Sequence, residues 1–173
     1  KAMALETDAT RTEAAEAMVK AVVDRWGTVD ILLNGAGGFH QFAAITDITD
    51  EEWDRVITVN LRSTFVCSRA AARIMIERRK GRIINIASGS GIAPNPFAPT
   101  YLPYGAAKAG VIMFAKILGR DLRVRLPSRW AGGAAKAWVR ENILGRQSGF
   151  LHASLGTGLG PGVPVLRHSG FGS

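Results

Sequence analysis

Arg82-Ile83-Ile84-Asn85-Ile86-Ala87-Ser88 is the stretch of sequence that decides the fold. Its centre is apolar, which is typical of a strand that is covered on both faces of a parallel sheet. Two shorter strand-like runs lie upstream, at Ala2 to Thr7 and at Val29 to Leu33. The sequence therefore predicts three strands within residues 2–88.

A segment with helical periodicity follows each of these strands. The first begins at the capping box Thr10-Arg11-Thr12-Glu13, with Thr10 as the N-cap, and ends at Gly27. The second covers residues 51–79 and the third covers residues 104–120. Strands that alternate with helices in this way indicate an α/β domain with a parallel sheet and right-handed crossovers.

Tyr104 and Lys108 stand four residues apart at the start of the third helix. Residues at this spacing share one face of a helix, so a phenol and an ammonium project together. A neighbouring cation favours the phenolate and lowers the pKa of a tyrosine from its reference value of about 10. The hydroxyl of Ser88, or that of Ser90, is a candidate to hold a substrate oxygen beside the pair. The combination predicts acid/base chemistry on an alcohol or carbonyl oxygen.

Polar or glycine-rich residues follow each predicted strand. Asp8 comes after the first, the loop Asn34-Gly35-Ala36-Gly37 after the second, and Ser88 ends the third. Ligands of parallel α/β sheets bind at the carboxyl ends of the strands. A shared binding cleft is therefore expected at that edge of the sheet.

Composition describes an ordinary globular protein, with 47% hydrophobic and 21% charged residues. The net charge of +8 is concentrated in residues 120–173, so it is not evidence of a basic face on the folded part. The single cysteine, Cys67, excludes an internal disulfide and fits a reducing cytoplasm. No apolar run reaches the roughly 18 residues of a membrane span. We expect a cytoplasmic protein without a metal site or a membrane partner.

Four motifs, in this order, resemble the short-chain dehydrogenase/reductase family in its short single-domain type. They are Asp8-Ala9, the loop Asn34-Gly35-Ala36-Gly37, Asn60 within the long helix, and the set Ser88, Tyr104 and Lys108. The resemblance covers roughly residues 2–120. It implies a partial Rossmann-like doubly wound parallel sheet with flanking helices, from which the first strands are absent.

The resemblance also implies the role of each motif residue. Tyr104 would be the catalytic acid/base, Ser88 would orient the substrate oxygen, and Asn60 would hold a relay water. Lys108 would assist Tyr104 and bind the nicotinamide ribose. Asp8 and Ala9 would contact the adenine of NAD or NADP, and the loop of residues 34–37 would lie against the cofactor. From the residues alone, Asp8 is equally well a turn residue and Asn60 an exposed helix residue.

The chain departs from the family pattern in three places. No glycine-rich pyrophosphate loop precedes Asp8, so an N-terminal truncation is expected, and with it the loss of the residue that selects NAD or NADP. Ser88 and Tyr104 are 16 positions apart, slightly more than the family spacing. After Arg120 the expected strand and Pro-Gly turn give way to a basic Gly/Arg-rich tail. We therefore divide the chain into a partial dinucleotide-binding domain, residues 1–120, and a poorly ordered or non-native continuation, residues 121–173.

Three functions follow from these observations, in descending order. The first is an NAD(P)-dependent oxidoreductase for a small alcohol or ketone, with the activity of the truncated chain left open. The second is a catalytically dead α/β module that self-associates, because family subunits pair through the helices at residues 51–79 and 104–120. The third is a basic nucleic-acid-binding protein. It ranks last because the sequence shows neither a recognition helix nor a strand platform with interleaved aromatic residues.

Overall fold

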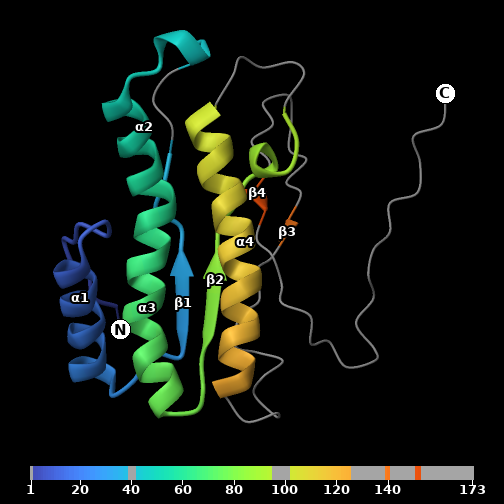
Figure 1. Cartoon of the computed structure of the whole chain (residues 1–173). Coiled ribbons are helices and arrows are strands. Elements are labelled where there is room, and N and C mark those ends of the chain that lie inside the picture. Colours follow the sequence, from blue (N-terminus) through green and yellow to red (C-terminus); the bar gives the residue numbers. More distant parts are fainter. Residues whose placement is uncertain (1, 39–41, 95–101, 126–138, 141–150, 153–173) are drawn as a thin grey trace.

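The structure, a computed structural model, describes residues 2–38, 42–94, 102–125, 139–140 and 151–152. Helices and two parallel strands alternate along the first part of the chain (Figure 1). In chain order the elements are α1 (Thr12–Trp26), β1 (Ile31–Asn34), η1 (Ile45–Asp47), α2 (Asp50–Ile57), η2 (Thr58–Arg62), α3 (Ser63–Glu77), β2 (Arg82–Asn85), η3 (Gly89–Gly91), α4 (Leu102–Arg125), β3 (Val139–Arg140) and β4 (Leu151–His152).

The strands β1 and β2 pair in parallel, with Ile31 beside Arg82 and Asn34 beside Asn85. One face of this pair is covered by the helices α3 and α4 (Figure 1). On the other face, the side chains of Ile31 and Leu33 are 62% and 60% exposed. The α/β fold with a parallel sheet is therefore confirmed.

The run from Ala2 to Thr7 is not a strand, and the prediction of one there was wrong. A strand exists only where a neighbouring strand accepts and donates its backbone hydrogen bonds. By the family resemblance, residues 2–7 correspond to the third strand of a doubly wound sheet. That strand pairs with the second strand of the sheet and not with the fourth. Within the described ranges no strand lies beside residues 2–7, so they have no partner for backbone hydrogen bonds despite their strand-like composition.

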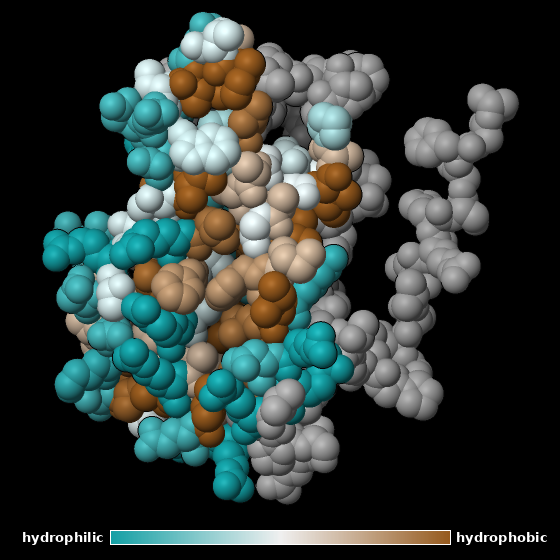
Figure 2. Space-filling view, in the orientation of Figure 1, coloured by the Kyte–Doolittle hydropathy of each residue, from teal (hydrophilic) through white to brown (hydrophobic). Residues whose placement is uncertain are grey.

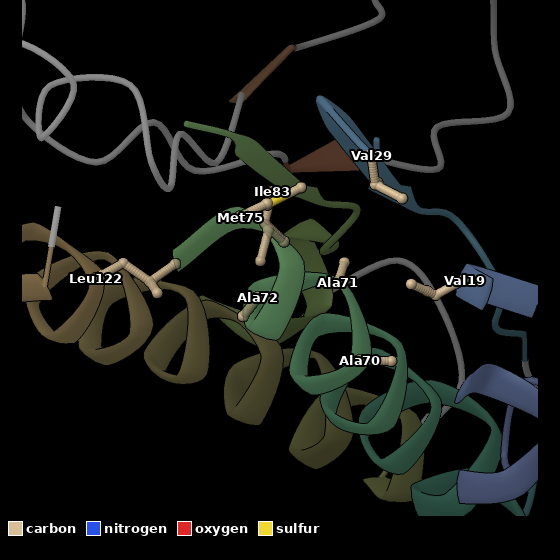
Figure 3. Packing of buried hydrophobic residues seen from close by; sticks show 8 residues of the cluster. All are labelled: Val19, Val29, Ala70, Ala71, Ala72, Met75, Ile83 and Leu122. Atoms are coloured by element: carbon tan, nitrogen blue, oxygen red, sulfur yellow. The ribbon is translucent and has the colours of Figure 1, made fainter. Parts of the chain in front are cut away.

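The core lies between the sheet and the helices (Figure 3). Ile83 of β2, Met75 of α3 and Leu122 of α4 are almost completely buried. Burial of side chains of this size contributes about 1.5–3 kcal/mol each. Gly81 precedes β2 and packs so closely on Met75 that a Cβ atom would overlap its side chain. Gly81 is thus a packing residue and not the helix cap that its position suggests.

A turn of π-helix interrupts the helix expected at residues 51–79. The hydroxyl of Thr49 caps its start by accepting a hydrogen bond from the Glu52 N–H. The α2 segment then ends at Ile57, η2 is a π-turn over Thr58–Arg62, and α3 continues to Glu77. Such insertions often occur at functional sites. Here the π-turn contains Asn60.

The N-terminus of α1 differs from the predicted capping box. The helix begins at Thr12, and its N-cap residue, Arg11, makes no side-chain cap. Thr10 instead donates from both its N–H and its hydroxyl to Asp8 Oδ1, at 2.9 and 2.7 Å. Asp8 and Thr10 therefore form a local turn before the helix. The prediction of Thr10 as the N-cap was wrong because its hydroxyl already serves this turn.

Arginines of the long helix bind the α1 segment from one end to the other. Arg62 donates to the Thr10 carbonyl, Arg69 to the Thr12 hydroxyl, Arg73 to the Glu16 carboxylate, and Arg78 to the Gly27 carbonyl. These four arginines therefore serve the packing of α1 against the long helix. Their charge is explained by these contacts without a nucleic-acid surface.

Two helix ends offer a paired test of backbone strain. Gly27 follows α1 with φ of 78° and has open space around its Cα, whereas Arg79 follows α3 with φ of 53°. Only glycine adopts this conformation without strain. Gly27→Ala should lower the free energy of unfolding by about 1 kcal/mol, and Arg79→Gly should raise it by up to about 1 kcal/mol. Urea unfolding of both variants checks this, and a change of the same sign in both would contradict it.

The C-terminal part of the chain is described only in places. The helix α4 runs to Arg125. Val139–Arg140 and Leu151–His152 pair as antiparallel strands β3 and β4. The remainder of the tail predicted at residues 121–173 lies outside the described residues, so that division of the chain stays a prediction. Among the helices described, none combines the length and apolar character that crossing a bilayer would need.

Candidate active site

Lys108 is a buried cation at the centre of the site. It lies on α4, and its side chain is only 4% exposed. Its Nζ donates a hydrogen bond of 3.0 Å to the Ile86 carbonyl, just beyond β2. Burial lowers the pKa of the Lys108 ammonium below its usual value of 10.5, because the charged form loses hydration.

Tyr104 lies one helical turn before Lys108 and is half-buried. The Lys108 Nζ is 5.5 Å from the centroid of the Tyr104 ring. At this distance an ammonium is attracted to the ring face. The i and i+4 spacing thus brings the two groups together, as expected of one helix face.

Ser88 ends the segment that carries the Ile86 carbonyl. It is buried, and its Oγ accepts a hydrogen bond of 3.3 Å from the Ser90 N–H. The backbone of Ser90 therefore helps to orient the Ser88 side chain, and the choice between Ser88 and Ser90 as the site hydroxyl stays a prediction. The loop at residues 95–101, which connects this turn to Tyr104, lies outside the described residues.

Asn60 joins the π-turn to the glycine loop. Its Nδ2 donates to the carbonyls of Val56 and Gly38, at 2.9 and 2.7 Å, and its Oδ1 accepts from the Gly38 N–H at 3.0 Å. It is fully buried, so the alternative of an exposed helix residue is wrong. Both amide hydrogens are in use, so a water could bind this side chain only at Oδ1.

Gly37 is the residue at which the glycine loop meets the lysine. Its φ is 147°, and a Cβ atom built on it would lie 2.5 Å from Asn60 Oδ1 and 3.2 Å from Lys108 Nζ. A side chain at this position is therefore excluded both by conformation and by contact. The loop after β1, the π-turn and α4 converge at this one glycine.

Asn34 belongs to a buried polar cluster that the sequence analysis did not identify. Its Nδ2 donates to Asn85 Oδ1 and to Ser68 Oγ, both at 2.8 Å. The cluster joins the last paired residues of β1 and β2 to α3. The sequence contained one signal, an asparagine within the apolar run of residues 82–88. Its partners could not be inferred, because Ser68 and Asn34 are distant from it in the chain.

Asp8 and Ala9 lie just before α1, and within the described residues none of their hydrogen bonds involves Lys108 or Gly37. The Asp8 carboxyl is exposed, and hydrogen bonds from the Thr10 side chain and backbone lower its pKa. The Ala9 carbonyl faces the Cys67 thiol of α3, with 3.8 Å between the sulfur and the oxygen. Burial raises the pKa of Cys67, so this thiol is not activated.

Most of the glycine loop is open to solvent. Gly35, Ala36 and Gly37 are exposed, and no atom lies within 4 Å of a Cβ built on Gly35 or Gly38. Such open backbone at the carboxyl end of a parallel strand fits a cofactor that approaches the chain closely. Within the described part of the chain, no cluster of three metal-ligating side chains exists.

The burial of Lys108 predicts a pH-dependent stability. The unfolded chain keeps its proton up to about pH 10.5, whereas the folded chain loses it at a lower pH. The unfolded state therefore binds more protons in that interval, and the stability of the folded state rises with pH through it. Relative to Lys108→Met, the wild type should gain stability between neutral pH and pH 10.5 in urea unfolding. A difference that stays constant across this range would contradict the expectation.

Comparison with known proteins gives one consistent result. The sequence profile of the short chain dehydrogenases matches residues 1–125. The chain is 33% identical over 125 residues to a 3-oxoacyl-[acyl-carrier-protein] reductase of Synechocystis sp., covering 72% of this chain and 49% of the relative. It is 41% identical over 125 residues to the reductase of the same name from Vibrio cholerae, again covering 72% and 49%.

Solved structures match a similar share of the chain. The crystal structure of gox2181 matches with a TM-score of 0.68 and 32% identity, over 70% of this chain and 47% of that one. The NAD+-bound xylitol dehydrogenase matches with a TM-score of 0.64 and 32% identity, over 69% and 45%. The chain thus spans about half the length of the relatives that it matches.

Proposed function

This chain belongs to the short-chain dehydrogenase family, and on that premise we propose that its site transfers hydride between NAD or NADP and an alcohol or ketone. One observation carries the proposal. A buried ammonium, that of Lys108, lies 5.5 Å from the Tyr104 ring and beside the open glycine loop. Such a reaction requires a proton donor, a cation that stabilises its conjugate base, and a place for the cofactor, for which we propose the open glycine loop.

Tyr104 is the proposed proton donor and acceptor. In the reductive direction its phenol protonates the substrate oxygen while the carbonyl carbon receives the hydride, and a phenolate remains. The Lys108 ammonium stabilises that phenolate. Ser88 holds the substrate oxygen by a hydrogen bond. In the oxidative direction the phenolate removes the proton of the alcohol.

A nicotinamide cofactor bound at the loop of residues 34–37 supplies or accepts the hydride. Lys108 binds its ribose in this proposal, and Asp8 with Ala9 binds its adenine. Asn60 holds the loop by its two hydrogen bonds to Gly38. Its remaining acceptor position, on Oδ1, is the one available to a relay water.

The proposed substrate class is a 3-oxoacyl thioester, which contains a ketone. The support is that the relatives from Synechocystis and Vibrio cholerae are 3-oxoacyl-[acyl-carrier-protein] reductases. The NAD+-bound xylitol dehydrogenase supports a polyol instead. Two assays separate these classes: oxidation of NADH or NADPH with an acetoacetyl thioester, and reduction of NAD+ or NADP+ with xylitol.

Cofactor binding by the 173-residue chain is the direct test. Calorimetric titration with NADH and with NADPH should give a dissociation constant below about 1 mM, within the range of ordinary enzyme–substrate affinities. No detectable heat at that concentration would instead support a catalytically dead module. Lys108→Met is the matched variant, and it should weaken binding if the lysine contacts the ribose.

Self-association is proposed for either function. Figure 2 shows apolar side chains gathered over the face formed by α2, α3 and α4. Met113 and Ile117 of α4 are 54% and 61% exposed, and Trp53 and Phe65 are also exposed. Phe65 packs edge-on against Phe114 of α4, with 6.4 Å between ring centroids. We propose that a second copy of this chain covers this face.

Ile117→Asp tests the proposed interface. A charge in a buried interface without a partner is costly, so the variant should sediment as a monomer at concentrations where the wild type is dimeric. Ile45→Asp is the matched control, because Ile45 is similarly exposed but lies in η1 and not in α2, α3 or α4. Equal loss of the dimer in both variants, or its retention in Ile117→Asp, would refute the interface.

A further inference from the structure

Two glycines that no motif accounts for lie where η3 meets α4. A Cβ atom on Gly91 would lie 2.6 Å from Ala109 N and from the Lys108 carbonyl carbon, and 2.9 Å from the Lys108 oxygen. A Cβ atom on Gly105 would lie 3.0 Å from the Ser90 oxygen. Neither glycine has a positive φ, so contact and not conformation excludes a side chain. The atoms opposed to them belong to the backbone and cannot rotate away.

Hydrogen bonds within the η3 turn connect Gly91 to Ser88. The Gly91 N–H donates to the Ser88 carbonyl at 3.0 Å, and the Ser90 N–H donates to the Ser88 hydroxyl. The Ile92 N–H closes the turn by donating to the Gly89 carbonyl at 2.8 Å. Ser88 is thus bound at both its backbone and its side chain to the turn that Gly91 seats on α4.

The α4 backbone touched by Gly91 is the part that carries the acid/base pair. Lys108 itself supplies two of the opposed atoms, and Gly105 directly follows Tyr104. The separation between Ser88 and this pair therefore depends on how closely η3 approaches the helix. Two residues without side chains permit that approach.

We propose that Gly91 is a positioning residue that holds Ser88 in register with Tyr104 and Lys108, with Gly105 as the second point of contact. The inference rests on the proposed function for the role of Ser88. The close contact between η3 and α4 can be measured even if the chain shows no turnover.

Gly91→Ala is the test variant. The turn must retreat by several tenths of an ångström or more, and a misplacement of about 1 Å can cost about 10²-fold in rate. We expect kcat for ketone reduction to fall by about 10²-fold while the dissociation constant of NADPH changes less than about 3-fold. Gly81→Ala is the control, because it crowds Met75 of the core and no residue of the site. It should lose stability but keep kcat.

A double-mutant cycle with Ser88→Ala shows whether Gly91 acts through the serine. Coupled positions give non-additive effects, so Gly91→Ala should cause almost no further loss of kcat when Ser88 is already alanine. Losses that multiply, or an unchanged kcat in folded Gly91→Ala, would overturn the proposal. If Gly91→Ala does not fold, Gly105→Ala opposes a single oxygen and should show a smaller loss with the same non-additivity.

Hydrogen exchange separates this inference from the proposed function. Should the wild-type chain show no turnover, the proposed reaction fails, but the seating of η3 is still measurable. The amide hydrogens of Ser90 and Gly91 should exchange at least about 10-fold faster when position 91 or position 105 carries alanine, because opening of the turn exposes them. In Gly81→Ala they should not. Unchanged exchange in both test variants would refute the seating.

Discussion

Replacing Tyr104 by phenylalanine should lower kcat by about 10²–10⁴-fold, the range expected when a general acid is removed. The substitution removes only the hydroxyl. The ring remains, and with it the surface that lies 5.5 Å from the Lys108 ammonium. Lys108 also keeps its hydrogen bond to the Ile86 carbonyl, so the cation should stay in place.

Cofactor affinity is the control for this variant. Because the loop of residues 34–37 and Lys108 are unchanged, the dissociation constant of NADPH for Tyr104→Phe should lie within about 3-fold of the wild-type value. Steady-state kinetics at saturating cofactor and calorimetric titration measure the two quantities. Turnover that survives in Tyr104→Phe would exclude the phenol as the acid/base group.

Gly37→Ala should be the most damaging substitution in the glycine loop. Its backbone has φ of 147°, which costs an L-residue about 1–3 kcal/mol. Its Cβ would also lie 2.5 Å from Asn60 Oδ1, the atom that accepts the Gly38 N–H. Overpacking of this kind adds about 1–3 kcal/mol. The free energy of unfolding should fall by about 2–6 kcal/mol.

The same change at Gly35 is the matched control for stability. No atom lies within 4 Å of a Cβ at Gly35, and its φ is not in the left-handed region. Gly35→Ala should therefore shift the free energy of unfolding by less than about 0.5 kcal/mol. Urea unfolding of both variants gives the comparison. Equal losses would show that glycine flexibility in the loop, and not the contact with Asn60, determines the effect.

Elements with strong local patterns were predictable from the sequence. The long helix was predicted from residue 51 and begins at Asp50, because the Thr49 cap and the acidic residues after it act locally. The pairing of Tyr104 with Lys108 follows from the helix period alone. The run at residues 2–7 shows the limit, because strand composition yields a strand only if a neighbour is present.

The cap predicted at Thr10 failed for a similar reason. The hydroxyl had two possible partners within a few residues, the helix N-terminus and the Asp8 carboxylate, and sequence alone does not rank them. Asn60 shows the opposite case. Its identity suggested a specific partner, but the π-turn that turns it towards Gly38 depends on contacts across 22 residues.

The sequence by itself determined the α/β alternation, the family motifs and the closeness of Tyr104 to Lys108, because each depends on residues that are neighbours along the chain. Only the tertiary structure decided that Asn34 is bound to Asn85 and Ser68, that Gly37 touches both Asn60 and Lys108, and that Gly91 seats Ser88 against α4. The physical reason is distance along the chain. Helix period and turn conformation depend on residues that are close in the sequence, whereas close backbone contacts between elements form only when those elements pack together.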